Sequence, residues 1–168
     1  MGVTIHFEGR LKGDKAFICR IKRVEQIATA ETLLTEKIEN QEVKLLRVRD
    51  EESWDYVGPT KGIILYLHEA GEPVRLEFDR DLYIQQWVKT QSTGRRIHMR
   101  LTALLRDLQL FFEELEVDDE GQCDIGDEAL LTEHRCRCDE AIAQFAKENP
   151  TARVKVRESN GRYTDLIT

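Results

Sequence analysis

The chain has 168 residues and a formal net charge of −7, with 40% hydrophobic and 34% charged residues. This length and balance predict one soluble domain with its own core, and the acid excess disfavours nucleic acids and anionic membranes as partners. No apolar run reaches the ~18 residues of a membrane helix, and the N-terminus lacks the basic and apolar regions of a signal peptide. We therefore expect a cytoplasmic protein whose four cysteines are thiols.

The first third of the chain predicts a strand, a helix and a returning strand segment. Residues 3–7 alternate between apolar and polar side chains, which is typical of a strand with one buried face. Residues 14–31 carry an apolar stripe at helical spacing, and Asp14 is placed to cap the first turn of this helix. Residues 33–50 are expected to form one or two strands, and residues 51–59 a loop that contains a Trp and a Tyr.

A hairpin of residues 63–67 and 74–78 is the predicted centre of the sheet. The first segment is continuously apolar, as in a strand buried on both faces, whereas the second alternates, as in a strand with one wet face. Residues 68–73 contain the Gly and Pro expected of the turn. Residues 82–91 fit either a short helix or an extended arm over the sheet.

The C-terminal half predicts two more helices and a final hairpin. Residues 97–115 keep apolar side chains at helical spacing for about five turns, and a third helix is expected at residues 128–147. An Asn-Gly pair joins two strand-like segments within residues 154–166, which is a strong hairpin signal. The predicted class is a single α+β domain, with a mostly antiparallel sheet and about three helices packed on it.

Nine acidic residues and no Lys or Arg lie between residues 113 and 128. This stretch partly matches a calcium-binding loop, but the first position lacks the usual Asp and the last lacks the usual Glu. A β-hairpin across residues 115–125 is the favoured alternative, and we expect no metal and no cofactor. The acidic side chains proposed to bind a partner are Glu116, Asp118, Asp119 and Glu120.

Two further groups of residues resemble functional sites but are explained more simply by structural roles. His134, Cys136 and Cys138 are zinc-ligand types, but on one helix Cys136 points away from the other two. A basic cluster at residues 95–100, which includes His98, is interpreted as a solvated helix entry, although it could also grip a phosphate or an acidic partner.

Several motifs resemble a family of small bacterial proteins of uncharacterised function. They are G-V-T-I-H-F-E-G at residues 2–9, W-D-Y-x-G-P-x-K-G-I at 54–63, E-F-D-x-D-L-Y-I-Q at 77–85 and K-T-Q at 89–91. The resemblance implies a bacterial, cytoplasmic, single-domain protein and brings no activity, cofactor or catalytic residue. If these motifs mark a shared surface, its aromatic members are Trp54, Tyr56, Tyr83 and Trp87.

The leading functional hypothesis is a non-enzymatic binding protein with a basic protein partner. An acidic immunity-type protein that neutralises a basic toxin or effector domain is one example, because charge complementarity speeds capture. The alternative is a small enzyme or ligand-binding domain around the central hairpin, with a polar site of His68, Glu69, Asp79 and Asp81. The oligomeric state is left open.

Overall fold

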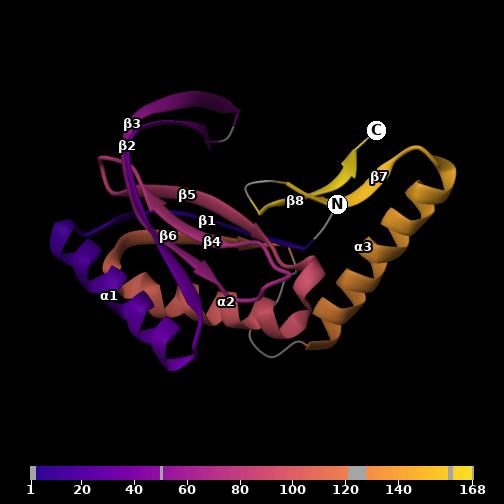
Figure 1. Ribbon diagram of the computed structural model, residues 1–168, viewed down its shortest axis with the longest axis horizontal. Helices are drawn as coiled ribbons and strands as arrows, with labels where there is room; N and C mark the ends of the chain where they lie inside the picture. Colours follow the sequence, from indigo (N-terminus) through magenta and orange to yellow (C-terminus); the bar gives the residue numbers. More distant parts are fainter. Residues whose placement is uncertain (1–2, 50, 121–127, 159–160, 168) are drawn as a thin grey trace.

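The computed structural model describes residues 3–49, 51–120, 128–158 and 161–167. This part of the chain forms an α+β fold with three α-helices, as the sequence predicts. All the strand pairs are antiparallel, but they divide into three sheets rather than one. Figure 1 shows the strands of two of these sheets together above a pair of helices, with the third sheet to one side.

The first sheet has β1 (Thr4–Leu11) at its centre, between β5 (Tyr83–Lys89) and β6 (Phe112–Asp119). Ile5 and Phe7 of β1 are buried on the face that meets the helices, as their alternation predicts. Most of the segment at residues 82–91 is therefore strand β5, followed by the 3₁₀ helix η1 (Gln91–Thr93), rather than a short helix or an extended arm over the sheet.

The second sheet consists of β2 (Leu34–Arg49), β3 (Glu52–Tyr66) and β4 (Val74–Phe78). The predicted central hairpin is present as β3 and β4, but residues 52–59 of the expected loop belong to β3. Pro59 is tolerated in this strand because it lies opposite a bulge in β2, where no ladder hydrogen bond is needed from it.

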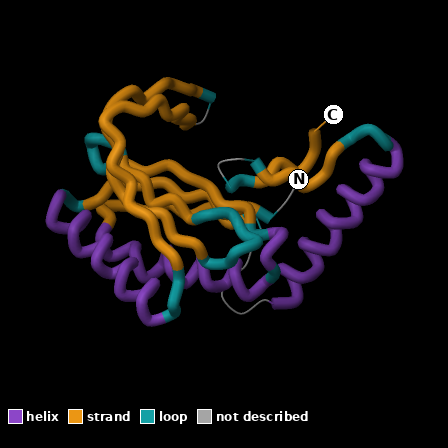
Figure 2. The backbone as a smooth tube through the Cα atoms, in the orientation of Figure 1, coloured by secondary structure: helices purple, strands orange, loops and turns teal. Residues whose placement is uncertain are grey.

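The β2–β3 hairpin bends beyond that bulge, so that its far end curls back over the first sheet (Figures 1 and 2). We call this far end, residues 43–49 and 51–57, the arm. Bulges increase local twist and redirect a strand, which accounts for the change of direction. At the base of the arm, the Asn40 side-chain amide donates to Thr60 Oγ1, and the Thr60 hydroxyl donates to the buried Glu77 carboxylate at 2.7 Å.

Helices α1 (Asp14–Ala30) and α2 (Arg95–Leu108) lie on the opposite side of the strands from the arm (Figure 1). Their apolar stripes and the inner faces of the strands form one hydrophobic core. The predicted cap is wrong: Gly13 is the N-cap residue of α1, and the Asp14 carboxylate instead accepts from Lys61 Nζ at 3.0 Å.

The predicted helix at residues 97–115 ends at Leu108. The 3₁₀ helix η2 (Gln109–Phe111) follows it, and the chain then enters β6. Phe112 and Leu115 are both buried although they are three residues apart, because a bulge in the β1–β6 pairing shifts the register between them. This strand irregularity imitates helical spacing, which explains the error.

The C-terminal part consists of α3 (Glu128–Glu148) and the hairpin of β7 (Arg153–Arg157) and β8 (Tyr163–Ile167), both predicted. The Glu72 carboxylate ties this hairpin to the body, because it accepts from the Tyr163 N–H at 2.6 Å and from the Lys89 N–H at 2.8 Å. Burial raises the pKa of Glu72, partly countered by these hydrogen bonds. No helix in the described ranges is long and apolar enough to cross a membrane.

Candidate functional site

The site is built on the face of the first sheet that points away from the helices. Residues directly opposite one another in paired strands project to the same face, so the register defines which side chains lie together. We call this the outer face; its nine side chains are Tyr83, Arg10 and Glu114, then Gln85, Glu8 and Glu116, then Trp87, His6 and Asp118.

Two neighbouring cavities lie between the arm and the outer face. The acidic cavity, of about 540 Å³, is lined by six carboxylates, three arginines and three aromatic rings. The apolar cavity, of about 670 Å³, adds Leu45, Leu46 and Val48 of the arm and the ring of Trp87. Glu8, Arg47 and Glu116 line both, so the two cavities form a groove divided near its middle.

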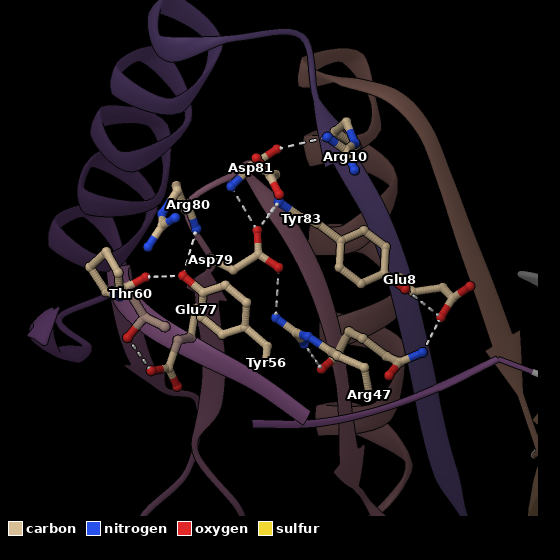
Figure 3. A network of polar contacts seen from close by, with 12 residues as sticks. Glu8, Arg10, Arg47, Tyr56, Thr60, Glu77, Asp79, Arg80, Asp81 and Tyr83 are labelled. Atoms are coloured by element: carbon tan, nitrogen blue, oxygen red, sulfur yellow. Dashed lines mark hydrogen bonds and ion pairs between the residues drawn. The ribbon is translucent and has the colours of Figure 1, made fainter. Parts of the chain in front are cut away.

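Arg47 fastens the arm to the sheet at this division (Figure 3). Its side chain is only 2% exposed, and it donates to the Asp79 carboxylate at 3.3 Å and to the Gln85 carbonyl at 3.2 Å. Its guanidinium also lies 5.2 Å from the centre of the Tyr83 ring, within cation–π range. Breaking one partner of such a buried pair is costly, so the arm is held closely to the sheet.

A second set of hydrogen bonds crosses the floor of the groove beside Arg47. The Tyr83 hydroxyl donates to Glu8 Oε2 at 3.0 Å, and the Gln85 side-chain amide donates to the same carboxylate. Burial raises the pKa of Tyr83, and the hydrogen bond to Glu8 raises it further. Glu8, Tyr83 and Gln85 thus form a fixed polar floor.

Asp79 and Tyr56 have structural roles at the edge of the acidic cavity. Asp79 Oδ1 accepts from the backbone N–H groups of Asp81 and Tyr83, both at 3.0 Å, which fixes the turn between β4 and β5. The Tyr56 hydroxyl donates to the Pro59 carbonyl at 2.7 Å and accepts from the Arg80 N–H. These groups position the groove and are not available to a ligand.

The charged groups of the acidic cavity differ in whether they already have partners within the protein. Its three arginines are engaged, because Arg47 pairs with Asp79, Arg10 donates to the Asp81 carbonyl and Arg49 hydrogen-bonds Tyr83. Within the described ranges, no hydrogen bond or close ion pair engages the carboxylates of Glu113, Glu114 and Glu116, which lie along one wall. Trp54 is 44% exposed in the same cavity. These three carboxylates and the Trp54 ring suit a ligand whose positive charge is part of a planar group or is attached to an apolar chain.

The structure brings together most of the residues selected from the sequence, although they come from separate segments. Trp54, Tyr56, Tyr83, Asp79, Asp81 and Glu116 line the acidic cavity. Trp87, Asp118 and Glu116 line the apolar cavity. In the latter, the Arg162 guanidinium stacks 3.8 Å from the centre of the Trp87 ring.

Asp119 and Glu120, which the sequence proposes as partner-binding residues, contact other parts of the chain in the structure. Asp119 Oδ2 lies 2.9 Å from Nε2 of His98, and Nδ1 of His98 lies 2.7 Å from the Thr90 hydroxyl. The Glu120 carboxylate accepts from the Thr4 N–H at 3.1 Å. Both carboxylates therefore hold the strand β1–β6 pairing and helix α2 in place.

The buried Thr90–His98–Asp119 chain was missed by the sequence interpretation, which placed His98 on a solvated helix entry. His98 has no exposed surface, and Thr90 is 1% exposed, so neither group is accessible to a substrate. The available signal was that His98 shares the apolar stripe of Leu101 and Leu105 on α2.

The alternative polar site cannot form as predicted. His68 and Glu69 lie in the exposed turn at one end of the β3–β4 hairpin, whereas Asp79 and Asp81 follow its other end. Five paired positions separate the two ends, which places them roughly 14 Å or more apart at about 3.4 Å per residue. The two pairs of residues therefore belong to different surfaces.

The described residues contain no group of three or more His, Cys, Asp or Glu side chains with the geometry to hold a metal ion. Most of the partial calcium loop, residues 121–127, lies outside the described residues, as does the predicted hairpin return. On α3, Cys136 is exposed and Cys138 is half-buried, and burial raises the pKa of the Cys138 thiol.

No family model, curated protein or solved structure matches the chain significantly. The resemblance of four short motifs to a bacterial protein family therefore stays a prediction.

Proposed function

We propose that the protein is a non-enzymatic binding protein that receives a basic segment of a partner protein in the groove under the arm. The observation that carries this proposal is the wall of Glu113, Glu114 and Glu116, which line the acidic cavity together with the exposed Trp54 ring. A Lys or Arg side chain would gain ionic hydrogen bonds from the wall and cation–π attraction from the ring.

The charge of the groove supports a basic occupant. Six carboxylates outnumber three arginines around the acidic cavity, and the whole chain carries a formal charge of −7. Clefts lined by one sign of charge raise the local concentration of oppositely charged ligands and speed their association. A basic toxin or effector domain is a partner class with this chemistry, so an immunity-type role remains part of the proposal.

The rigidity of the groove also supports binding. Arg47, Asp79 and the polar floor are mutually hydrogen-bonded, so the partner would meet a preformed surface. Preformed sites bind more tightly because less conformational freedom is lost on association. The alternative of a small enzyme loses support, because His68 and Glu69 lie far from the other two residues proposed for its active site.

The experiment is a pull-down from lysate of the native host with three versions of the protein, followed by mass spectrometry. The test variant is Glu113→Lys/Glu114→Lys/Glu116→Lys. The matched control is Glu39→Lys/Glu133→Lys/Glu140→Lys, which changes the net charge by the same amount at exposed positions away from the groove. Both variants are checked for folding by their melting temperature.

The proposal expects a basic protein that the wild type and the control variant retain and the test variant loses. Retention by all three proteins would place the binding site elsewhere. Loss from both variants would mean that net charge, and not the groove, attracts the partner.

A further inference from the structure

The part of β2 that lies in the arm is the edge of its sheet. The side-chain amide of Gln85 hydrogen-bonds to one backbone position of this edge. β2 is the outer strand of its sheet, with β3 on its other side. The Val48 N–H donates to Gln85 Oε1 at 2.9 Å, and Gln85 Nε2 donates to the Val48 carbonyl. The primary amide of Gln85 therefore pairs with Val48 as the backbone of a neighbouring strand would.

This pairing reveals the orientation of the rest of the edge. In an antiparallel ladder, residues two apart point their N–H and C=O groups to the same side. Because both groups of Val48 point away from β3, those of Leu46 and Lys44 do so as well. Within the described part of the chain, no hydrogen bond is found for the backbone groups of Leu46 and Lys44 on this side.

The edge borders the apolar cavity. Leu46 and Val48, which line this cavity, are 66% and 46% exposed. Across the cavity stand the Trp87 ring and the carboxylates of Glu116 and Asp118. A strand added here would thus find unpaired backbone groups, apolar contacts and negative charge in one place.

We propose that an extended basic segment of the partner adds to the β2 edge at Lys44 and Leu46, next to the position that Gln85 occupies. This inference rests on the proposed function and specifies its mode: backbone pairing with the arm, with alternate side chains directed toward Glu116 and Asp118. Added strands obtain affinity from backbone hydrogen bonds and specificity from pockets for alternate side chains. We therefore expect the partner segment to have basic residues at alternate positions and apolar residues between them.

A second copy of the chain is the competing occupant, because exposed edges can pair with each other. Its charge argues against this, since each copy carries a formal charge of −7 and both edges lie beside carboxylates. Like charges brought together at an interface oppose association.

The probe is the capped hexapeptide Val-Arg-Val-Lys-Val-Arg, whose affinity is measured by fluorescence anisotropy. Two N-methylated forms of this peptide are compared with it. One form is methylated on the backbone nitrogens of the three Val residues, and the other on those of the Arg and Lys residues. Only one set of N–H groups can face the β2 edge, so one form should bind about tenfold or more weaker and the other about as well as the parent. The protein itself is unchanged in this comparison.

A protein variant gives an independent check. Leu46→Pro removes the edge N–H from a position where proline fits an outer strand, and Leu46→Ala removes only the side chain. Leu46→Pro should weaken the probe about tenfold beyond Leu46→Ala, and bound peptide should protect the Leu46 and Lys44 amides from hydrogen exchange.

Equal binding of both N-methylated forms, with sensitivity to the Glu113/Glu114/Glu116 reversal retained, would overturn strand addition and leave the proposed function standing. Absence of any binding by the probe would count against the proposed function itself. A dimer of the wild type that Leu46→Pro converts to monomer in sedimentation would assign the edge to a second copy and overturn the proposal.

Discussion

Arg20 offers a direct test of the energetics of this core. It lies on α1 with no exposed surface, and none of its three guanidinium nitrogens has a hydrogen-bond partner among the described residues. Its guanidinium lies 3.9 Å from the centre of the Phe78 ring. Burial lowers the pKa of Arg20 to about 9. We predict that Arg20→Met, which keeps the aliphatic stem and removes the charge, stabilises the protein.

The magnitude follows from the lowered pKa of Arg20. That pKa is about 3.5 pH units below the ordinary value of 12.5, and at about 1.4 kcal/mol per unit the burial costs about 5 kcal/mol. The cation–π contact with Phe78 returns about 1–2 kcal/mol. The expected net gain for Arg20→Met is therefore about 3–4 kcal/mol in the free energy of unfolding, since well-packed apolar replacements of buried charges are often stabilising.

Urea unfolding at several pH values measures this gain. The folded protein releases the Arg20 proton at lower pH than the unfolded chain, so the full penalty is present below pH 9. Above pH 9 it shrinks by about 1.4 kcal/mol per pH unit, and the gap between wild type and Arg20→Met should narrow accordingly.

Arg23→Met is the matched control for Arg20→Met. Arg23 is an exposed arginine on the same helix, paired with Asp107 at 2.8 Å. Losing this exposed pair should change the stability little, because solvent and salt screen surface charges. A loss of stability in Arg20→Met, or a gap between wild type and Arg20→Met that does not change with pH, would refute the reasoning about the buried charge.

Two further predictions concern the packing of α2. His98→Ala removes the bridge between Thr90 and Asp119 and should cost about 1–3 kcal/mol in urea unfolding, because it leaves buried polar groups without their partner; a change within about 0.5 kcal/mol would show that water replaces the imidazole. Leu105→Ala and Leu108→Ala should each cost about 2–5 kcal/mol, since both side chains are almost fully buried, and a loss below about 1 kcal/mol at both sites would contradict that burial.

The elements with undisturbed periodicity could be predicted from the sequence. The β3–β4 hairpin, helix α1 and the C-terminal hairpin each follow one pattern of apolar spacing that local geometry is sufficient to explain. Two errors in the bounds of strands and helices occurred at bulges. Pro59, which lies opposite the bulge in β2, made the segment before it look like a loop, and the bulge near Leu115 made part of β6 look like helix.

The site could be predicted only in pieces. The exposed aromatics and the acidic stretch were selected separately, as residues with an excess of binding chemistry. Their meeting depends on the bend of the arm and on the buried pair of Arg47 and Asp79, which are 32 residues apart in the chain. Periodicity carries no information about such a contact. Asp119 and His98 were misjudged in the opposite way. Their polar side chains predict a position on the surface, but in the structure they contact each other and join β6 to α2.

The central claim is that the acidic cavity captures a basic partner. The most direct test is stopped-flow association with the protein that the pull-down identifies, at ~50 and ~500 mM salt, where screening of long-range charge differs most. The account predicts that high salt slows association about tenfold or more, with a smaller effect on dissociation, and that Glu113→Lys/Glu114→Lys/Glu116→Lys is equally slow at low salt. An association rate that neither the salt nor this variant changes would contradict the claim.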